Sequence, residues 1–202
     1  MRILGIDPGS RITGYGIIDT SGSTNSYGAN GSSCGAKGSS YGAKGSSYGA
    51  KGSTYVASGV VKTLHNDFPD RLKVIFEGIG QIIDQYQPHC ISIEKVFVAK
   101  NADSALKLGH ARGAAICAAV SRDLPVYEYT AKQTKQAVVG AGGAAKNQVQ
   151  HMVMMILNLN GEIQEDAADA LAAAICHQNV SSTASQIKGQ QQISGSKKGR
   201  WQ

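Results

Sequence analysis

The spacing of hydrophobic and polar positions predicts a chain in which strands and helices alternate. Short apolar runs rich in β-branched residues predict strands at residues 3–6, 15–18, 55–62, 90–93 and 126–129. Hydrophobic residues at helical spacing predict helices at residues 68–86, 101–120, 130–139, 146–157 and 166–177. Asp67 is the expected N-cap of the first helix, and Pro88 ends it. A chain of 202 residues, 42% of them hydrophobic, can bury one sizeable core and requires no second domain.

Two segments do not follow these patterns. Between residues 20 and 54 a Gly-Ala-Lys-Gly-Ser-Ser-Tyr unit recurs, with two glycines and one large side chain in each copy. The simplest interpretation is a disordered loop that grew by duplication at a hairpin tip, where added length costs little closure entropy. The alternatives are a Lys/Tyr tether that touches DNA by charge and base stacking, and a small Gly-rich solenoid. Residues 181–202 are rich in Ser, Gln, Gly and Lys and are predicted to be a disordered basic tail.

The formal net charge of +6 comes mainly from these two segments. They carry seven basic residues and no acidic ones, so the rest of the chain has thirteen basic and fourteen acidic residues. A nearly neutral core suits local contact with phosphates better than it suits a globally cationic protein.

The cysteines and the hydrophobic runs indicate a cytoplasmic protein. Cys34, Cys90, Cys117 and Cys176 stand singly, without the paired spacing of a zinc site or a disulfide framework. We therefore expect reduced thiols. No apolar run has the length of a transmembrane helix, and the first residues do not resemble a signal peptide, so no membrane partner is expected.

Acidic residues stand at three structurally related places. Asp7 directly follows the first predicted strand and precedes a Pro-Gly turn, and Glu94 directly follows the fourth strand. Asp166 and Asp169 are three residues apart, so they share one face of the first turn of the last helix. A strand, an Asp and a Gly-rich turn occur both in actin-like ATPases and in nucleases of the ribonuclease H type. Taken alone, each acid could equally be a helix cap or a solvated charge.

As a set, the four acids suggest a metal site. A nuclease that uses two Mg²⁺ ions holds them roughly 4 Å apart on oxygen ligands, where one activates water and the other stabilises the leaving oxygen. Without metal, four adjacent carboxylates would repel one another and raise each other's pKa, which makes a purely structural cluster a poor explanation. Asp7, Glu94, Asp166 and Asp169 are therefore the candidate metal ligands and catalytic residues.

The chain resembles the RuvC family of bacterial Holliday junction resolvases. The similarity covers nearly everything except the insert and the tail. It is carried by long motifs at residues 4–16 (LGIDPGSRITGYG), 93–97 (IEKVF) with 99–109 (AKNADSALKLG), 135–140 (KQAVVG) and 166–171 (DAADAL).

The resemblance implies an α/β fold of the RNase H-like type, with a mixed five-stranded sheet whose first three strands are antiparallel and with helices on both faces. Residues 1–180 would form one nuclease domain, interrupted by the insert at about residues 20–54. The family also implies Mg²⁺, two ions per subunit with Mn²⁺ as a substitute. It further implies a homodimer that cuts opposed strands of a four-way junction symmetrically and works with the RuvA-RuvB branch-migration complex in DNA recombination and repair.

Three further residues take roles from the resemblance. Lys135 and Lys146 would contact backbone phosphate near the cut, although each could also be a solvated helix charge. Phe97 would press against a base at the crossover, although it could also be a core aromatic residue. Lys95 stands where the family usually has Gln, and its charge could lower the pKa of the neighbouring carboxylate or touch phosphate.

Two other functions stay open at this stage. An actin-like ATPase or sugar kinase would need a second phosphate loop and a second domain, which this short chain does not show. A junction-binding protein without catalysis would result if the insert blocked productive docking.

Overall fold

A computed structural model describes residues 1–20, 52–64, 67–96 and 101–195, with side chains described as far as residue 184. The repeat insert, Cys34 and Phe97 lie outside the described residues. In chain order the elements are β1 (Arg2–Asp7), β2 (Ile12–Thr20), β3 (Ser53–Lys62), α1 (Phe68–Tyr86), β4 (Cys90–Glu94), α2 (Ala102–Val120), β5 (Val126–Tyr129), α3 (Ala131–Val139), α4 (Lys146–Leu157) and α5 (Glu165–Gly195).

The strands form one mixed sheet in the order β3-β2-β1-β4-β5. The first three are antiparallel neighbours, whereas β4 runs parallel to β1 and β5 runs parallel to β4. Thr20 pairs with Ser53, so the insert connects two adjacent strands of a hairpin. The predicted fold class is confirmed, and β2 and β3 are both longer than the sequence pattern indicated.

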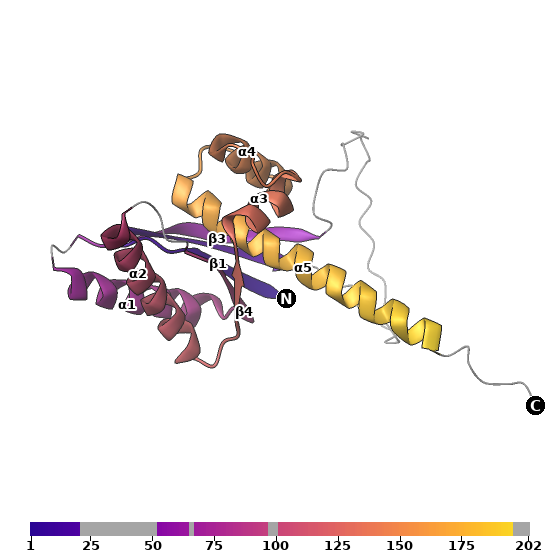
Figure 1. Ribbon diagram of the computed structural model, residues 1–202, viewed down its shortest axis with the longest axis horizontal. Coiled ribbons are helices and arrows are strands. Elements are labelled where there is room, and N and C mark those ends of the chain that lie inside the picture. The colour runs from indigo at the N-terminus through magenta and orange to yellow at the C-terminus, as the bar shows by residue number, and fades with distance from the viewer. Residues whose placement is uncertain (21–51, 65–66, 97–100, 196–202) are drawn as a thin grey trace, which may run out of the picture.

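Helices cover both faces of the sheet, with α1 and α2 on one side and α3, α4 and α5 on the other (Figure 1). The alternation of side chains along β1 produces this division, because successive residues of a strand point to opposite faces. Leu4 and Ile6 join the core beneath α1 and α2, while Ile3 joins the core beneath α4 and α5.

The start of α5 approaches β1 and β2 closely at two glycines. A Cβ atom on Gly5 would collide with the backbone of Ala170, and one on Gly14 would collide with the carbonyl of Asp166. The helix contributes the small residue Ala170 to this contact, where it is fully buried. Because glycine lets two backbones approach closely, the first turn of α5 lies directly against the β1-β2 hairpin.

The C-terminal helix corrects one prediction. We expected it to end near residue 177 and the tail to be disordered from residue 181, but α5 continues to Gly195. Ser, Gln and Lys rarely form a hydrophobic core, but Gln and Lys have good helix propensity. A tail of this composition is therefore not expected to be buried, although it can still form a helix. Figure 1 shows the last turns of α5 extending away from the sheet.

Three smaller expectations can be compared with the structure. Asp67 is at the N-cap of α1 as predicted, but its side chain makes no capping hydrogen bond. Cys90, Cys117 and Cys176 form no disulfide with one another in the described part of the chain. Among the described helices, none has both the length and the hydrophobicity that are needed to cross a bilayer.

Candidate active site

The sheet brings the first two predicted acids to one edge. Asp7 is the last residue of β1 and Glu94 is the last residue of β4. These strands are parallel neighbours, and Ile6 is paired with Ile93, so the two acids occupy equivalent positions at the carboxyl ends of the strands. Both side chains are partly buried.

The close approach of α5 supplies the other two acids. Asp166 and Asp169 lie in the first turns of this helix, and both are partly buried. The backbone of Asp166 lies directly over Gly14, which pairs with Asp7 across the β1-β2 hairpin. The glycine contact therefore sets the position of these two acids relative to Asp7.

The electrostatics show that the four acids share one site. Burial, followed by the negative charges of Asp169, Glu94 and Asp166, raises the pKa of Asp7 to about 7. Burial, followed by the charge of Asp169, also raises the pKa of Glu94 above its ordinary value. The structure thus places together the four acids that the sequence predicted, from three separate elements.

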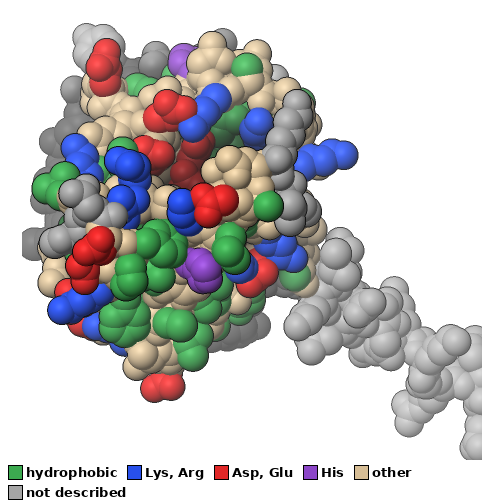
Figure 2. Space-filling view, turned by 60° about the vertical axis from the view of Figure 1, so that its left-hand side comes forward, with side chains coloured by type: hydrophobic (Ala, Val, Ile, Leu, Met, Phe, Trp, Pro, Cys, Tyr) green, Lys and Arg blue, Asp and Glu red, His purple; other side chains and the backbone are tan. Residues whose placement is uncertain are grey.

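Two lysines border the acids. Lys135 projects from α3, and it lowers the pKa of Glu94, against the larger effect of burial, as Lys146 also does. Lys146 is the first residue of α4, and its Nζ lies 3.0 Å from Oδ2 of Asp169. A pocket of about 220 Å³ is lined by Glu94, Lys135, Lys146 and Asp169, together with Ala131, Thr134 and Val149. Figure 2 shows acidic side chains in a hollow of the surface with Lys and Arg side chains around it.

Local sequence explains how the two lysines reach one pocket. α3 begins with a capping box in which the side chains of Thr130 and Gln133 each bond the other residue's backbone. It ends at Gly140, whose positive φ of 79° suits glycine and turns the chain. The next helix starts at Lys146, and the glycine-rich connection folds α4 back beside α3.

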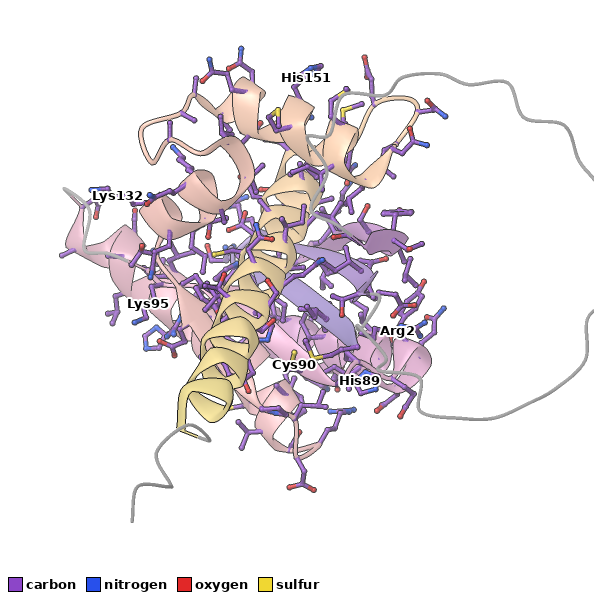
Figure 3. All side chains as sticks on the ribbon, turned by 90° about the vertical axis from the view of Figure 1, so that its right-hand side faces the viewer. Arg2, His89, Cys90, Lys95, Lys132 and His151 are labelled. Carbon is purple, nitrogen blue, oxygen red and sulfur yellow. The ribbon has the colours of Figure 1, made fainter. Side chains whose placement is uncertain are left out.

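Lys95 corrects one of its two expected roles, the effect on the neighbouring carboxylate, while contact with phosphate stays a prediction. Its side chain is exposed, and the cations that lower the pKa of Glu94 are Lys135 and Lys146. Successive residues of an extended chain point in opposite directions, so a residue next to Glu94 is directed away from it. Figure 3 shows Lys95 and Lys132 on one side of the molecule, with Arg2 and His89 on the other. The role predicted for Phe97 stays a prediction, because this residue lies outside the described ranges.

Sequence reasoning missed two residues at the site. Glu165 forms an ion pair with Lys146, and its four-residue separation from Asp169 could have indicated a shared helix face. Arg112 of α2 donates from Nε to the backbone carbonyl of Glu94 at 3.3 Å and forms an ion pair with Glu128 at 2.5 Å. No sequence signal identifies Arg112, because its partners lie on two other elements.

The carboxylate oxygens of the site suit a divalent cation, but the side chains are not arranged as a coordination site for one. Carboxylate oxygens are the ligands that Mg²⁺ accepts. In the part of the chain that the structure describes, however, no three Asp, Glu, His or Cys side chains converge closely enough to hold an ion. Repulsion keeps like charges apart, and Lys146 draws Asp169 to itself. Coordination would therefore require side-chain rotation.

A sheet of this order, with acids at the ends of β1 and β4 and at the start of α5, defines a nuclease of the RNase H-like fold. Two solved structures share the fold. The structure of RuvC from Thermus thermophilus matches with a TM-score of 0.71 and 29% identity, covering 91% of this chain and 97% of the other. The same protein in complex with Holliday junction substrate matches with a TM-score of 0.70 and 29% identity, covering 88% and 93%.

The family is shown by sequence. The family model for the crossover junction endodeoxyribonuclease RuvC matches residues 31–177. The RuvC protein of Vibrio vulnificus strain CMCP6 is 49% identical over 98% of both chains, and that of Edwardsiella ictaluri is 52% identical over 92% of this chain and 91% of its own. The chain belongs to the RuvC family of crossover junction endodeoxyribonucleases. This membership leaves the ATPase alternative without support.

Proposed function

We propose that this protein resolves Holliday junctions in DNA recombination and repair by cutting two opposed strands of a four-way junction. The observation that carries the proposal is that four carboxylates interact electrostatically with one another, and that two of them, Glu94 and Asp169, line one pocket with Lys135 and Lys146. In this arrangement the acids take a hard divalent cation and the lysines take the phosphate, which are the two requirements of metal-assisted phosphodiester cleavage.

The proposed metal is Mg²⁺, two ions per subunit, with Mn²⁺ as a substitute, held by Asp7, Glu94, Asp166 and Asp169. Bound ions supply an activated water and stabilise the leaving oxygen in nucleases of this kind. The carboxyl group of Asp7, whose pKa is about 7 without metal, ionises fully when a cation is adjacent, since a nearby positive charge lowers the pKa of an acid.

The cationic residues bind and orient the DNA backbone. Lys135 and Lys146 flank Glu94 and Asp169 in the pocket, so an ammonium group can hold a phosphate there and stabilise the charge that develops during cleavage. Phe97 follows β4 three residues after Glu94, and we propose that it presses against a base at the crossover.

The proposed working form is a homodimer, because a two-fold protein matches a two-fold substrate. An apolar groove on α2, lined by Val96, Ala102, Ala105, Leu106, Gly109, His110 and Arg112, is the proposed contact. The side chain of Leu106 is 60% exposed in the single chain, and a second copy of the protein would cover it. Leu106→Glu is expected to shift the protein to a monomer in sedimentation equilibrium, and an unchanged dimer would contradict this contact.

The remaining proposed partner is the RuvA-RuvB branch-migration complex, and the proposed location of the protein is the cytoplasm.

The experiment that tests the function incubates labelled four-way junction and plain duplex with the protein, with and without Mg²⁺. We expect paired nicks on the junction that need Mg²⁺, and little cutting of duplex. Asp7→Asn should abolish cutting while junction binding persists. Asp123→Asn is the matched control, because Asp123 is exposed and has a positive φ of 57° that Asn also tolerates. Metal-dependent cutting by Asp7→Asn would contradict the proposal, and binding without any nicks by the unaltered protein would favour a non-catalytic junction-binding protein.

A further inference from the structure

Lys146 is held by two carboxylates at the edge of the candidate active site. Its Nζ lies 3.0 Å from Oδ2 of Asp169 and also forms an ion pair with Oε1 of Glu165. Glu165 and Asp169 are four residues apart on α5, so the lysine spans neighbouring turns of one helix face. The proposed cleavage uses Asp169 and Lys146 but gives Glu165 no role.

The two carboxylates differ in their access to solvent. The side chain of Asp169 is 24% exposed, whereas that of Glu165 is 59% exposed and that of Lys146 is 52% exposed. Asp169 is therefore the inner partner of the lysine and Glu165 is the outer one. A DNA phosphate arrives from solvent, so it meets the outer contact first.

The ammonium group has a fixed number of donors to distribute. It carries three N–H groups, and two of them are directed to Glu165 and Asp169. Burial alone would lower the pKa of Lys146, but the hydrogen bonds with Glu165 and Asp169 outweigh it and raise the pKa. Lys146 is thus fully charged without DNA, and a phosphate that binds it exchanges one anion for another.

We infer that Glu165 is an internal stand-in for a DNA phosphate, which holds Lys146 in the free protein and is displaced when the backbone of the junction binds. Glu165 is then a positioning residue. It keeps the lysine ordered beside Asp169, and it lowers the affinity for DNA because every bound phosphate must replace it. The inference rests on the proposed function, since it requires DNA at this pocket.

The test measures binding of labelled four-way junction by fluorescence anisotropy, in EDTA and at low salt, where charge effects are least screened. Without divalent metal the readout is affinity and not cleavage. The proteins are the full chain, Glu165→Gln, Lys146→Gln and the double variant of these two positions. Glu162→Gln is the matched control, because Glu162 is exposed, lies three residues before Glu165, and forms no ion pair with any described residue. Thermal melting checks that each variant is folded.

Glu165→Gln should bind the junction roughly two- to five-fold more tightly than the unaltered protein, the range expected for releasing an exposed ion pair. Glu162→Gln should change affinity less. When Lys146 is already replaced by Gln, the further change Glu165→Gln should increase the affinity for the junction no more than Glu162→Gln increases it in the unaltered protein.

Two results would overturn the inference alone. One is an equal gain from Glu165→Gln and Glu162→Gln, and the other is a gain from Glu165→Gln that persists when Lys146 is absent. Either would mean that Glu165 acts only as a general negative charge. A failure of the unaltered protein to bind the junction would overturn the proposed function, and the inference with it.

Discussion

The two faces of the sheet are packed in opposite ways. Beneath α1 the contact is made by large aliphatic side chains, and Leu4, Ile6, Ile75 and Ile79 are fully buried there. Beneath the first half of α5, Gly5 and Gly14 let the backbone of the helix lie against the strands, next to the buried side chain of Leu171. The glycine contact gives a shorter and better defined separation between helix and sheet than the aliphatic contact does.

The difference shows that stability and positioning are supplied by different faces. Aliphatic packing tolerates small shifts, because side chains can change rotamer to refill the space. A glycine contact cannot adjust in this way, so it fixes Asp166 and Asp169 over Asp7. Such a fixed separation matters because a misplacement of about 1 Å at a catalytic group can cost about 100-fold in rate.

The largest effect is expected from Gly14→Ala on the glycine face. The added Cβ would collide with the carbonyl of Asp166, so the start of α5 must move away from β1 and β2. We expect cleavage of the four-way junction to fall about 100-fold or more. Single-turnover cleavage measures this, and circular dichroism at the assay temperature separates loss of activity from loss of fold. Near-normal cleavage would mean that α5 does not set the geometry of the acids.

Ile75→Ala makes the contrasting change on the aliphatic face. Ile75 is fully buried in α1, and truncating such a side chain costs about 2–5 kcal/mol of stability because it leaves a cavity. We expect the free energy of unfolding, measured by urea denaturation, to fall by that amount. Cleavage per folded molecule should stay close to that of the unaltered protein at a temperature where the variant is folded. A selective loss of cleavage would show that α1 also positions the acids.

The contribution of Asp7 to the pH dependence of stability should have the opposite sign to that of an acid in a salt bridge, whose pKa is lowered by folding. The pKa of Asp7 is about 7 in the folded protein and about 3.9 in an unfolded chain, so the folded state binds the proton more tightly. The stabilisation is complete below pH 4 and is lost as pH rises through 7. For metal-free protein we expect a loss on the order of 4 kcal/mol from this group.

Asp7→Asn isolates this contribution. It should be as stable as the unaltered protein or less so at pH 4, and more stable at pH 8, when both are compared by urea denaturation in EDTA. If the variant and the unaltered protein differ in free energy of unfolding by the same amount at both pH values, the ionised form of Asp7 is not destabilised by its surroundings.

The sequence could predict Asp7 and Glu94 as one site because the evidence is local. Each acid directly follows an apolar run, and parallel neighbouring strands bring their ends to the same edge. Asp166 and Asp169 were predictable as a pair by their spacing, but their position over Gly14 depends on how α5 crosses the sheet.

The rest of the site depends on angles between elements that no local pattern encodes. The ion pair between Lys146 and Glu165 requires the connection after Gly140 to fold α4 against the start of α5. The hydrogen bond from Arg112 to Glu94 joins α2 to the end of β4. The extension of α5 was missed for another reason, because a composition that cannot form a core can still form a helix.

The smallest effect is expected from Gly113→Ala on α2. It is the same substitution as Gly14→Ala, at a glycine whose added Cβ would meet no described atom within 4 Å. Alanine has the higher helix propensity, so the free energy of unfolding should rise by about 0.5–1 kcal/mol. Gly14 has no positive φ, so a lower free energy of unfolding for Gly14→Ala beside a higher one for Gly113→Ala would indicate that Gly14 is required by contact and not by backbone conformation.

The measurement on Gly113→Ala should be made at two protein concentrations, because the proposed dimer contact lies on the same helix. If the gain turns into a loss only at the higher concentration, Gly113 meets the second subunit. A loss at both concentrations would instead contradict the open space that the single chain shows at this position.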